Sequence, residues 1–110
     1  MFLLREATVD YKWRLTIPSA TADRESLMEE DEVFLSTRED GCLEIYFTQS
    51  SASLSFSRAP VIRIKIIQNK KDNQVRLIIP AVFRGLTSFF YGRNITIADF
   101  GKKIELWPRP

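Results

Sequence analysis

Residues 72–80 read Asp-Asn-Gln-Val-Arg-Leu-Ile-Ile-Pro, and residues 10–18 read Asp-Tyr-Lys-Trp-Arg-Leu-Thr-Ile-Pro. Asp, Arg, Leu, Ile and Pro recur at the same internal spacing, and the two copies lie 62 residues apart in a chain of 110. A repeat of this size indicates a duplicated supersecondary unit. We therefore predict one domain made of two related halves, repeat 1 at about residues 1–47 and repeat 2 at about 61–110, joined by a serine-rich linker at about 48–60.

The composition argues against an enzyme. The chain has no histidine and a single cysteine, Cys42, which removes Ser-His and Cys-His nucleophile schemes and most catalytic zinc sites. It also offers no glycine-rich phosphate loop and no metal-ligating cluster, so we predict no catalytic residue, no metal and no cofactor. A lone thiol is typical of a reducing cytosol, and we expect Cys42 to be an inert buried thiol. The apolar start, residues 1–4, is too short for a signal peptide or a membrane span.

Each half reads as strands around one short helix. Pro18 and Pro80 end the strands before the helices, because proline cannot donate to a ladder, and Gly41 is expected at positive φ in a turn. Since about 50 residues cannot bury both faces of a sheet, we predict a mainly β fold with short helices in which the halves close one small barrel. The predicted strands are 2–10, 13–17, 32–37, 42–47, 61–67, 75–79, 94–98 and 103–107. The first predicted helix is 19–30, with Ser19 or Thr21 as its cap and Glu25 as the reciprocal cap. The second is 81–90, and Gly92 is expected to end it.

The net charge of +2 is unevenly spread. Residues 58–76 carry six cations against one acid, a net charge of +5, and residues 19–32 carry six acids against one cation, a net charge of −5. The basic run is either a phosphate-binding face or a solvated edge strand guarded by lysine. The acidic run is expected to be a solvated helix end that points away from DNA and could meet the basic half of a neighbouring copy.

Each copy of the repeat pairs an aspartate with an arginine four residues later. A guanidinium at a hairpin tip can grip phosphate or read guanine through two hydrogen bonds, with the aspartate holding it ready. The same pair could instead be a loop-stapling salt bridge, worth about 1 kcal/mol or less if exposed. Trp13 is expected to be an exposed loop aromatic against DNA or a partner chain, and residues 89–91, Phe-Phe-Tyr, are either core or a stacking platform for bases.

The Asp-x-x-x-Arg motif, followed by an apolar strand that ends Ile-Pro, resembles that of the MraZ family of bacterial transcriptional regulators, relatives of the AbrB-type swapped-hairpin proteins. Asp10 and Arg14 carry it first, then Asp72 and Arg76, and Lys12 matches a lysine common in the first motif. Residues 40–46, 79–84 and 104–107 are similar to the family's first returning hairpin, helix start and closing strand. The segment between the repeats is shorter than is usual in the family.

The resemblance implies two tandem swapped-hairpin units that form one pseudo-dimeric double-split β-barrel. It implies a sequence-specific regulator, a repressor of MraZ type, that binds double-stranded promoter DNA, forms ring-shaped homo-oligomers and works in the bacterial cytoplasm at the nucleoid. Because the basic run lies in repeat 2, we expect the second hairpin to supply most of the binding. The implied roles are Arg14 and Arg76 as principal contacts, Lys12, Lys70 and Lys71 on phosphates, and Asp10 and Asp72 as orienting groups.

The chain departs from the family in its motif loops. The family usually has glycine before the motif arginine, whereas this chain has Trp13 and Val75. A position that needs positive φ would disfavour both, so the loop shape is expected to differ. The missing glycines and the small net charge favour an alternative function, a protein-interaction or assembly module, antitoxin-like, that has lost DNA readout.

Overall fold

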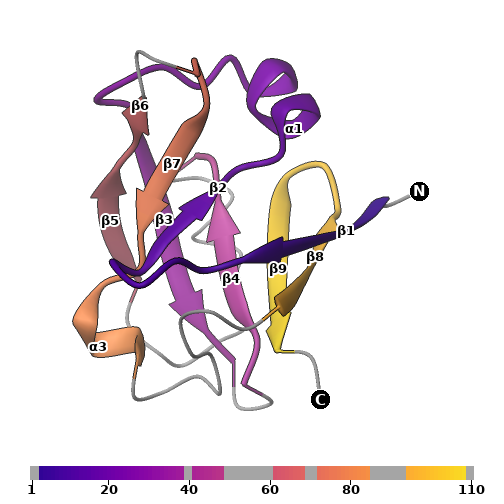
Figure 1. The fold of residues 1–110 in the computed structure, drawn as a ribbon, viewed down its shortest axis with the longest axis vertical. Helices are drawn as coiled ribbons and strands as arrows, with labels where there is room; N and C mark the ends of the chain where they lie inside the picture. Colours follow the sequence, from indigo (N-terminus) through magenta and orange to yellow (C-terminus); the bar gives the residue numbers. More distant parts are fainter. Residues whose placement is uncertain (1–2, 39–40, 49–60, 69–71, 85–93, 109–110) are drawn as a thin grey trace.

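A computed structural model describes residues 3–38, 41–48, 61–68, 72–84 and 94–108. These residues are mainly β with short helices (Figure 1), as the sequence predicts. Repeat 1 contributes β1 (Leu3–Thr8), β2 (Arg14–Thr16), α1 (Ser19–Arg24), β3 (Glu32–Thr37) and β4 (Leu43–Tyr46). Repeat 2 contributes β5 (Ile62–Lys65), β6 (Ile67–Gln68), β7 (Val75–Ile78), α3 (Ala81–Arg84), β8 (Asn94–Asp99) and β9 (Lys103–Pro108).

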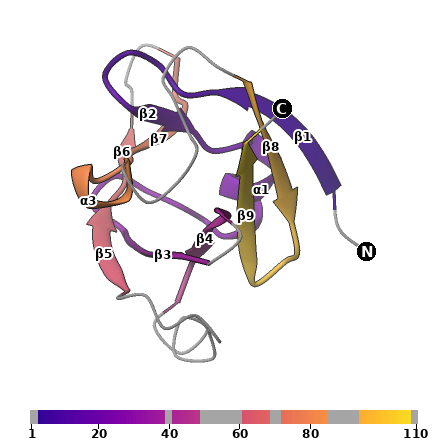
Figure 2. The ribbon, with the colours of Figure 1, turned by 90° about the horizontal axis from the view of Figure 1, so that it is seen from below.

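The strands of the two repeats are interleaved. β1 pairs with β8, β2 with β7, β4 with β9 and β3 with β5, so each of these ladders joins repeat 1 to repeat 2. The sheets run β1-β8-β9-β4-β3-β5 and β2-β7-β6, and the edge strands β1 and β5 lie on opposite sides of the molecule (Figure 2). The radius of gyration is 12.8 Å, close to the roughly 13 Å expected of one domain of this length. Closure into one barrel stays a prediction, because the described strands form two separate sheets.

An approximate two-fold relation organises the contact between β2 and β7. Leu15 lies opposite Leu77, and these residues are equivalent in the repeat because they are 62 positions apart. The flanking pairs, Arg14 with Ile78 and Thr16 with Arg76, exchange under the same offset. Two backbone hydrogen bonds continue the relation: Ile17 N–H donates to Val75 O at 2.8 Å, and Ile79 N–H donates to Trp13 O at 2.9 Å.

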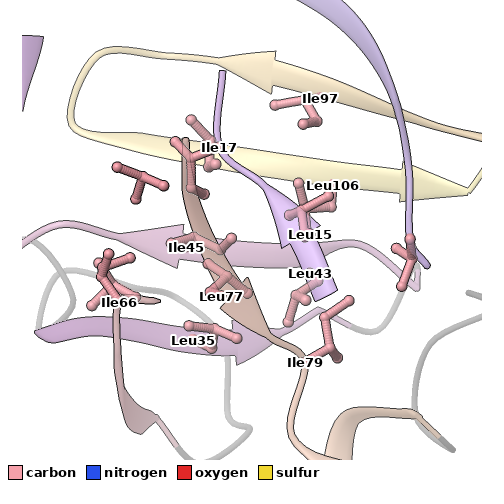
Figure 3. Close-up of a cluster of buried hydrophobic side chains, with 14 of the residues drawn as sticks. Leu15, Ile17, Leu35, Leu43, Ile45, Ile66, Leu77, Ile79, Ile97 and Leu106 are labelled. Atoms are coloured by element: carbon pink, nitrogen blue, oxygen red, sulfur yellow. The ribbon is translucent and has the colours of Figure 1, made fainter. Parts of the chain in front are cut away.

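The core lies between the two sheets (Figure 3). Leu15 and Leu77 point inward from the three-stranded sheet and are fully buried. Because side chains alternate along a strand, their neighbours Arg14, Thr16 and Arg76 stand on the opposite, outward face. The six-stranded sheet meets the two leucines with Leu35, Leu43, Ile45, Ile97, Ile104 and Leu106, all buried.

Two buried glutamates face each other on the other side of the six-stranded sheet. Glu44 lies opposite Glu105 in the β4–β9 ladder, and the residues are only 3% and 5% exposed. Lys103 Nζ contacts Glu44 and lies 3.0 Å from Glu105 Oε2, and Arg38 Nη1 lies 2.8 Å from that same oxygen. Burial opposes the charge on Lys103, but the hydrogen bonds to both glutamates raise its pKa. Two ring donors complete the cluster: Tyr46 OH donates to Glu44, and Trp107 Nε1 donates to Glu105, each at 3.0 Å.

Helix α1 is shorter than predicted, since it ends at Arg24 instead of residue 30. Ser26 adopts φ 51°, Leu27 N–H donates to Ala22 O at 2.9 Å, and Ser26 N–H donates to Asp23 O at 3.2 Å. These two bonds form a Schellman motif, which stops a helix at a left-handed residue. Glycine usually marks that position, so a serine there gave no signal in the sequence.

The predicted capping of α1 is also wrong. The N-cap residue is Pro18, and no side chain caps the helix. Glu25 is the C-cap residue and pairs with Arg24 at 3.1 Å, so it is too far along the helix to cap the first turn. Thr21 instead donates its hydroxyl to Asp99 of repeat 2 at 2.5 Å, which fastens α1 to the β8–β9 hairpin.

The predicted strand 61–67 is split between the sheets. Ile66 is buried, donates to Asp31 O at 2.7 Å and accepts from Glu30 N–H at 3.1 Å, so β5 and β6 diverge on either side of it.

The predicted positive φ of Gly41 (87°) and the predicted burial of Cys42 are confirmed. Gly92, residues 89–91 and residues 49–60 of the serine-rich linker lie outside the described residues. None of the described helices has the length and apolar character needed to cross a membrane.

Candidate nucleic-acid interface

The first motif loop is held together by Asp10. Its Oδ1 accepts hydrogen bonds from the backbone N–H groups of Lys12 and Arg14, both at 2.9 Å, and its Oδ2 accepts from Arg14 Nε at 2.6 Å. Trp13 N–H donates to Asp10 O at 2.9 Å and closes the turn. Partial burial opposes the charge on Asp10, but the hydrogen bonds from Arg14 and Lys12 outweigh it and lower the pKa of this carboxyl group.

Trp13 occupies the position where the loop needs a left-handed backbone. Its φ is 61°, a conformation that costs a residue other than glycine about 1–2 kcal/mol. The side chain is half-buried and packs against the core, so the expectation of an exposed loop aromatic is wrong. Packing of the indole can offset the backbone strain, which explains how a tryptophan occupies a position suited to glycine.

The second motif loop has another shape. Asp72 Oδ1 accepts from Gln74 N–H at 3.0 Å, and the left-handed residue is Asn73, φ 59°, which tolerates that conformation. Val75 lies within β7 and is not the left-handed residue of this loop, so the two motif loops of this chain differ in shape. The hydrogen bonds from the Arg76 side chain and the Gln74 backbone lower the pKa of Asp72.

The fold brings both motif arginines to one surface. In the β2–β7 ladder, Arg14 lies opposite Ile78, and Arg76 lies opposite Thr16. The arginines are therefore diagonal neighbours on the outward face, roughly 7–8 Å apart or somewhat less between their Cβ atoms by ordinary antiparallel geometry. Because the strands are antiparallel, the two motif loops lie at opposite ends of this sheet, each beside the helix that follows the other strand (Figure 1).

The two arginines are held by different atoms. Arg14 contacts Asp10 through Nε, and within the described part of the chain its Nη1 and Nη2 have no hydrogen-bond partner. Arg76 uses Nη2 for both Asp72 (2.8 Å) and Gln74 (3.0 Å), and its Nη1 lies 3.5 Å from Asp72 Oδ1. The side chain of Arg14 is 38% exposed and that of Arg76 is 19% exposed. This geometry favours Arg14 as the more available donor, the opposite of the ranking expected from the basic run.

Further cations lie around the first motif loop. Lys12 Nζ lies 5.7 Å from the ring of Tyr11, which is 70% exposed. Arg84, at the end of α3, lies 5.0 Å from the ring of Trp13. No sequence pattern places Arg84 beside Trp13, because the two residues belong to different repeats. Lys70 and Lys71, the predicted phosphate contacts of the second loop, lie outside the described residues.

Part of the basic run is neutralised within the chain. The β3–β5 ladder sets Glu32 opposite Lys65. Lys65 Nζ lies 3.0 Å from Glu30, which raises the pKa of Lys65, and Arg63 Nε lies 3.9 Å from Glu32. The acids at positions 29–32 are exposed, as predicted, but they do not form a helix end, because α1 stops at Arg24. Glu30 and Glu32 already face cations of their own chain. These acidic and basic side chains, which were expected to pair between copies, therefore already pair within one chain.

The outward face of β2 and β7, with its two motif loops, is the strongest candidate site among the described residues. These residues include no group of three or more His, Cys, Asp or Glu side chains placed to hold a metal ion. Comparison with models of known protein families and with curated protein sequences gives no match. Inference about function therefore rests on the motifs and on their geometry.

Proposed function

We propose that this protein is a sequence-specific DNA-binding transcriptional regulator that resembles the MraZ repressor and is not an enzyme. In this proposal the two repeats are tandem swapped-hairpin units that form one pseudo-dimeric double-split β-barrel. The interleaved ladders and the two-fold register about Leu15 and Leu77 support this view of the fold. A cytoplasmic, nucleoid-associated location in a bacterium follows from the same proposal.

One observation carries the proposal: Arg14 and Arg76 share an outward face, and each is held by the aspartate four residues before it. An aspartate that fixes one edge of a guanidinium reduces the conformational freedom lost when the other edge binds. In Arg14 the edge that remains carries both Nη groups, the pair of donors that matches guanine O6 and N7 or two phosphate oxygens. Lys12, exposed beside it, adds a cation for the DNA backbone, and Lys70 and Lys71 do the same for the second loop.

We expect Arg14→Ala to weaken binding to a preferred duplex by about 1–3 kcal/mol, the contribution of one good two-donor contact to a base. Arg76→Ala should cost less binding, because the Nη2 of Arg76 is already engaged by Asp72 and Gln74. The preferred duplex is obtained by selecting from random duplexes with the purified protein. Fluorescence anisotropy then compares the parent and both variants on the selected duplex and on a scrambled one.

The scrambled duplex is the control for sequence reading. On the scrambled duplex, Arg14→Ala should weaken binding much less than on the selected one. Lys12→Ala should weaken binding to both duplexes equally. If Arg14→Ala and Arg76→Ala both bind the selected duplex as well as the parent, this face does not read DNA and the proposal fails.

We also propose that the protein self-associates. Among the described strands, β1 and β5 are the edges of the six-stranded sheet, and Leu4 on β1 is 65% exposed. Open edges are templates for pairing with another chain, and strands that join different edges can close a ring. Light scattering at physiological salt should therefore report a mass that is a multiple of 12.8 kDa. A monomer at every micromolar concentration would remove this part of the proposal.

A second candidate function, the protein-interaction module that has lost DNA readout, is favoured by a groove beside β1. The groove has a volume of about 850 Å³, and residues Arg5–Thr8 of β1 line it together with the start of α1 and the second motif loop. The lining has three acidic residues, Glu6, Asp23 and Asp72, and one basic residue, Arg5. Because its charge is therefore negative, the partner that fits this groove best is an extended basic segment that adds a strand to β1. Weak DNA binding together with salt-insensitive capture of such a partner would place this candidate ahead.

A further inference from the structure

We infer that Ile67 and Ile78 are specificity-determining residues, which recognise thymine by contact with its 5-methyl group. The inference rests on the proposed function, and it adds to the motif arginines two residues that carry no charge. Both isoleucines lie in the three-stranded sheet, where β7 is flanked by β2 and β6 (Figure 1). They are 40% and 41% exposed, so the surface of this sheet is apolar as well as charged.

The strand register places each isoleucine beside a motif arginine. Ile78 lies opposite Arg14 in the β2–β7 ladder, and Ile67 lies opposite Arg76 in the β6–β7 ladder. Residues directly opposite in an antiparallel pair stand on the same face, with Cβ atoms about 4.5–5.5 Å apart. Leu77 is fully buried, so its neighbours on either side along β7 stand outward. Each motif arginine therefore has an exposed isoleucine directly across from it on the outward face.

The two isoleucines form a small apolar surface around Arg76. Ile67 lies across from Arg76, and Ile78 lies two residues along the same strand. Strand structure does not require isoleucine here, because the equivalent of Ile78 at the offset of 62 residues is Thr16, which is also β-branched and also lies in a strand. Exposed apolar side chains that are scattered singly need no explanation, but these flank a charged group. The face therefore presents apolar groups to the ligand that the arginines bind.

Thymine has the major-groove edge that matches such a face. It presents a methyl group there, to which apolar side chains bind, whereas guanine presents the O6 and N7 acceptors that match an arginine. The major groove admits a two-stranded β-ribbon, and the charges of Arg14 and Arg76 favour a polyanion as the ligand. A guanine read by either arginine is then accompanied by a thymine at a neighbouring base pair, against the isoleucine across the ladder.

Deoxyuridine substitution tests the inference, because deoxyuridine pairs as thymidine does and lacks the 5-methyl group. Each thymine of the duplex selected with the purified protein is replaced in turn, and fluorescence anisotropy measures the affinity. Burying one such group contributes a factor of about four in affinity, so at least one replacement beside a guanine should weaken binding by the parent about fourfold. At that position, Ile78→Ala or Ile67→Ala should bind the thymine and deoxyuridine duplexes equally well, as expected of coupled partners.

Two kinds of variant control for the loss of an apolar side chain. Ile78→Val and Ile67→Val keep a branched apolar group and should retain the preference for thymine. Phe100→Ala removes an apolar residue that is 44% exposed in the turn between β8 and β9, in the other sheet, and it should leave the preference of the parent unchanged. Thermal melting verifies the fold of every variant, and the deoxyuridine scan of the parent requires no variant.

The outcomes separate this inference from the proposed function. If the parent binds the selected duplex but every replacement is neutral, or if the selected duplex contains no thymine, the inference is overturned and the proposed function stands. The same holds if the loss on replacement persists in both alanine variants, since the methyl group is then sensed elsewhere. Alanine variants that keep the preference but lose mass in light scattering would assign the isoleucines to contacts between copies and overturn the inference. If the parent binds no duplex, both fail.

Discussion

Replacing Lys103 with methionine is expected to destabilise the fold by about 3–5 kcal/mol, the usual cost of removing one partner from a buried charge cluster. Lys103 lies between Glu44 and Glu105 and contacts both. Without it, two carboxylates face each other at 3% and 5% exposure, and Arg38 still pairs with Glu105. Among the described residues, Glu44 would keep the hydroxyl of Tyr46 as its one side-chain partner. Chemical denaturation at neutral pH measures the difference in unfolding free energy.

Two further variants make this result specific. Lys65→Met removes an exposed ion pair and should change the unfolding free energy far less than Lys103→Met does, because solvent screens such pairs. The double variant Lys103→Met with Glu44→Gln should recover much of the loss, because the carboxylate left without its cation is then neutral. Equal destabilisation by Lys103→Met and Lys65→Met would show that the cluster does not stabilise this face of the sheet.

Separating the repeats is expected to abolish folding altogether. Residues 1–57 alone would lack β8 for β1, β7 for β2, β9 for β4 and β5 for β3. The apolar faces of these strands would be exposed to water, and a chain of that length cannot compensate by burying its own surface. Expressed separately, residues 1–57 and 58–110 should each give a broad, non-cooperative melt by circular dichroism.

Mixing the two pieces provides the control. Because the missing strands of each piece are supplied by the other, an equimolar mixture should regain strand content and a cooperative transition. A sharp transition from either piece as a monomer would mean that the ladders between the repeats are not needed for folding.

The repeat in the sequence predicts more of this fold than the local patterns do. An offset of 62 residues is sufficient to anticipate that Leu15 and Leu77 are equivalent, and the structure pairs them. Alternation in residues 61–67 correctly places Arg63 and Lys65 outside, but it cannot reveal that the chain leaves one sheet at Ile66. That bend depends on backbone hydrogen bonds to Asp31 and Glu30, which are remote in the sequence.

The site could be predicted only where its parts are adjacent in the chain. Asp10 and Arg14 are four residues apart, so their pairing is visible in the motif and is present in the structure. The place of Arg84 on Trp13 depends on the packing of one repeat against the other, and no spacing encodes it. The glutamate cluster was also missed, although one signal existed: Glu44 and Glu105 are acids inside otherwise apolar closing strands.

The interleaving of the two repeats has a consequence for how copies of this chain meet while they fold. Every ladder between repeat 1 and repeat 2 can form equally well between repeat 1 of one molecule and repeat 2 of another. The choice depends on competition between the repeat tethered in the same chain, at an effective concentration on the order of millimolar, and the free concentration of other chains. Refolding at high concentration should therefore trap exchanged dimers whose secondary structure matches that of the monomer and whose size alone distinguishes them.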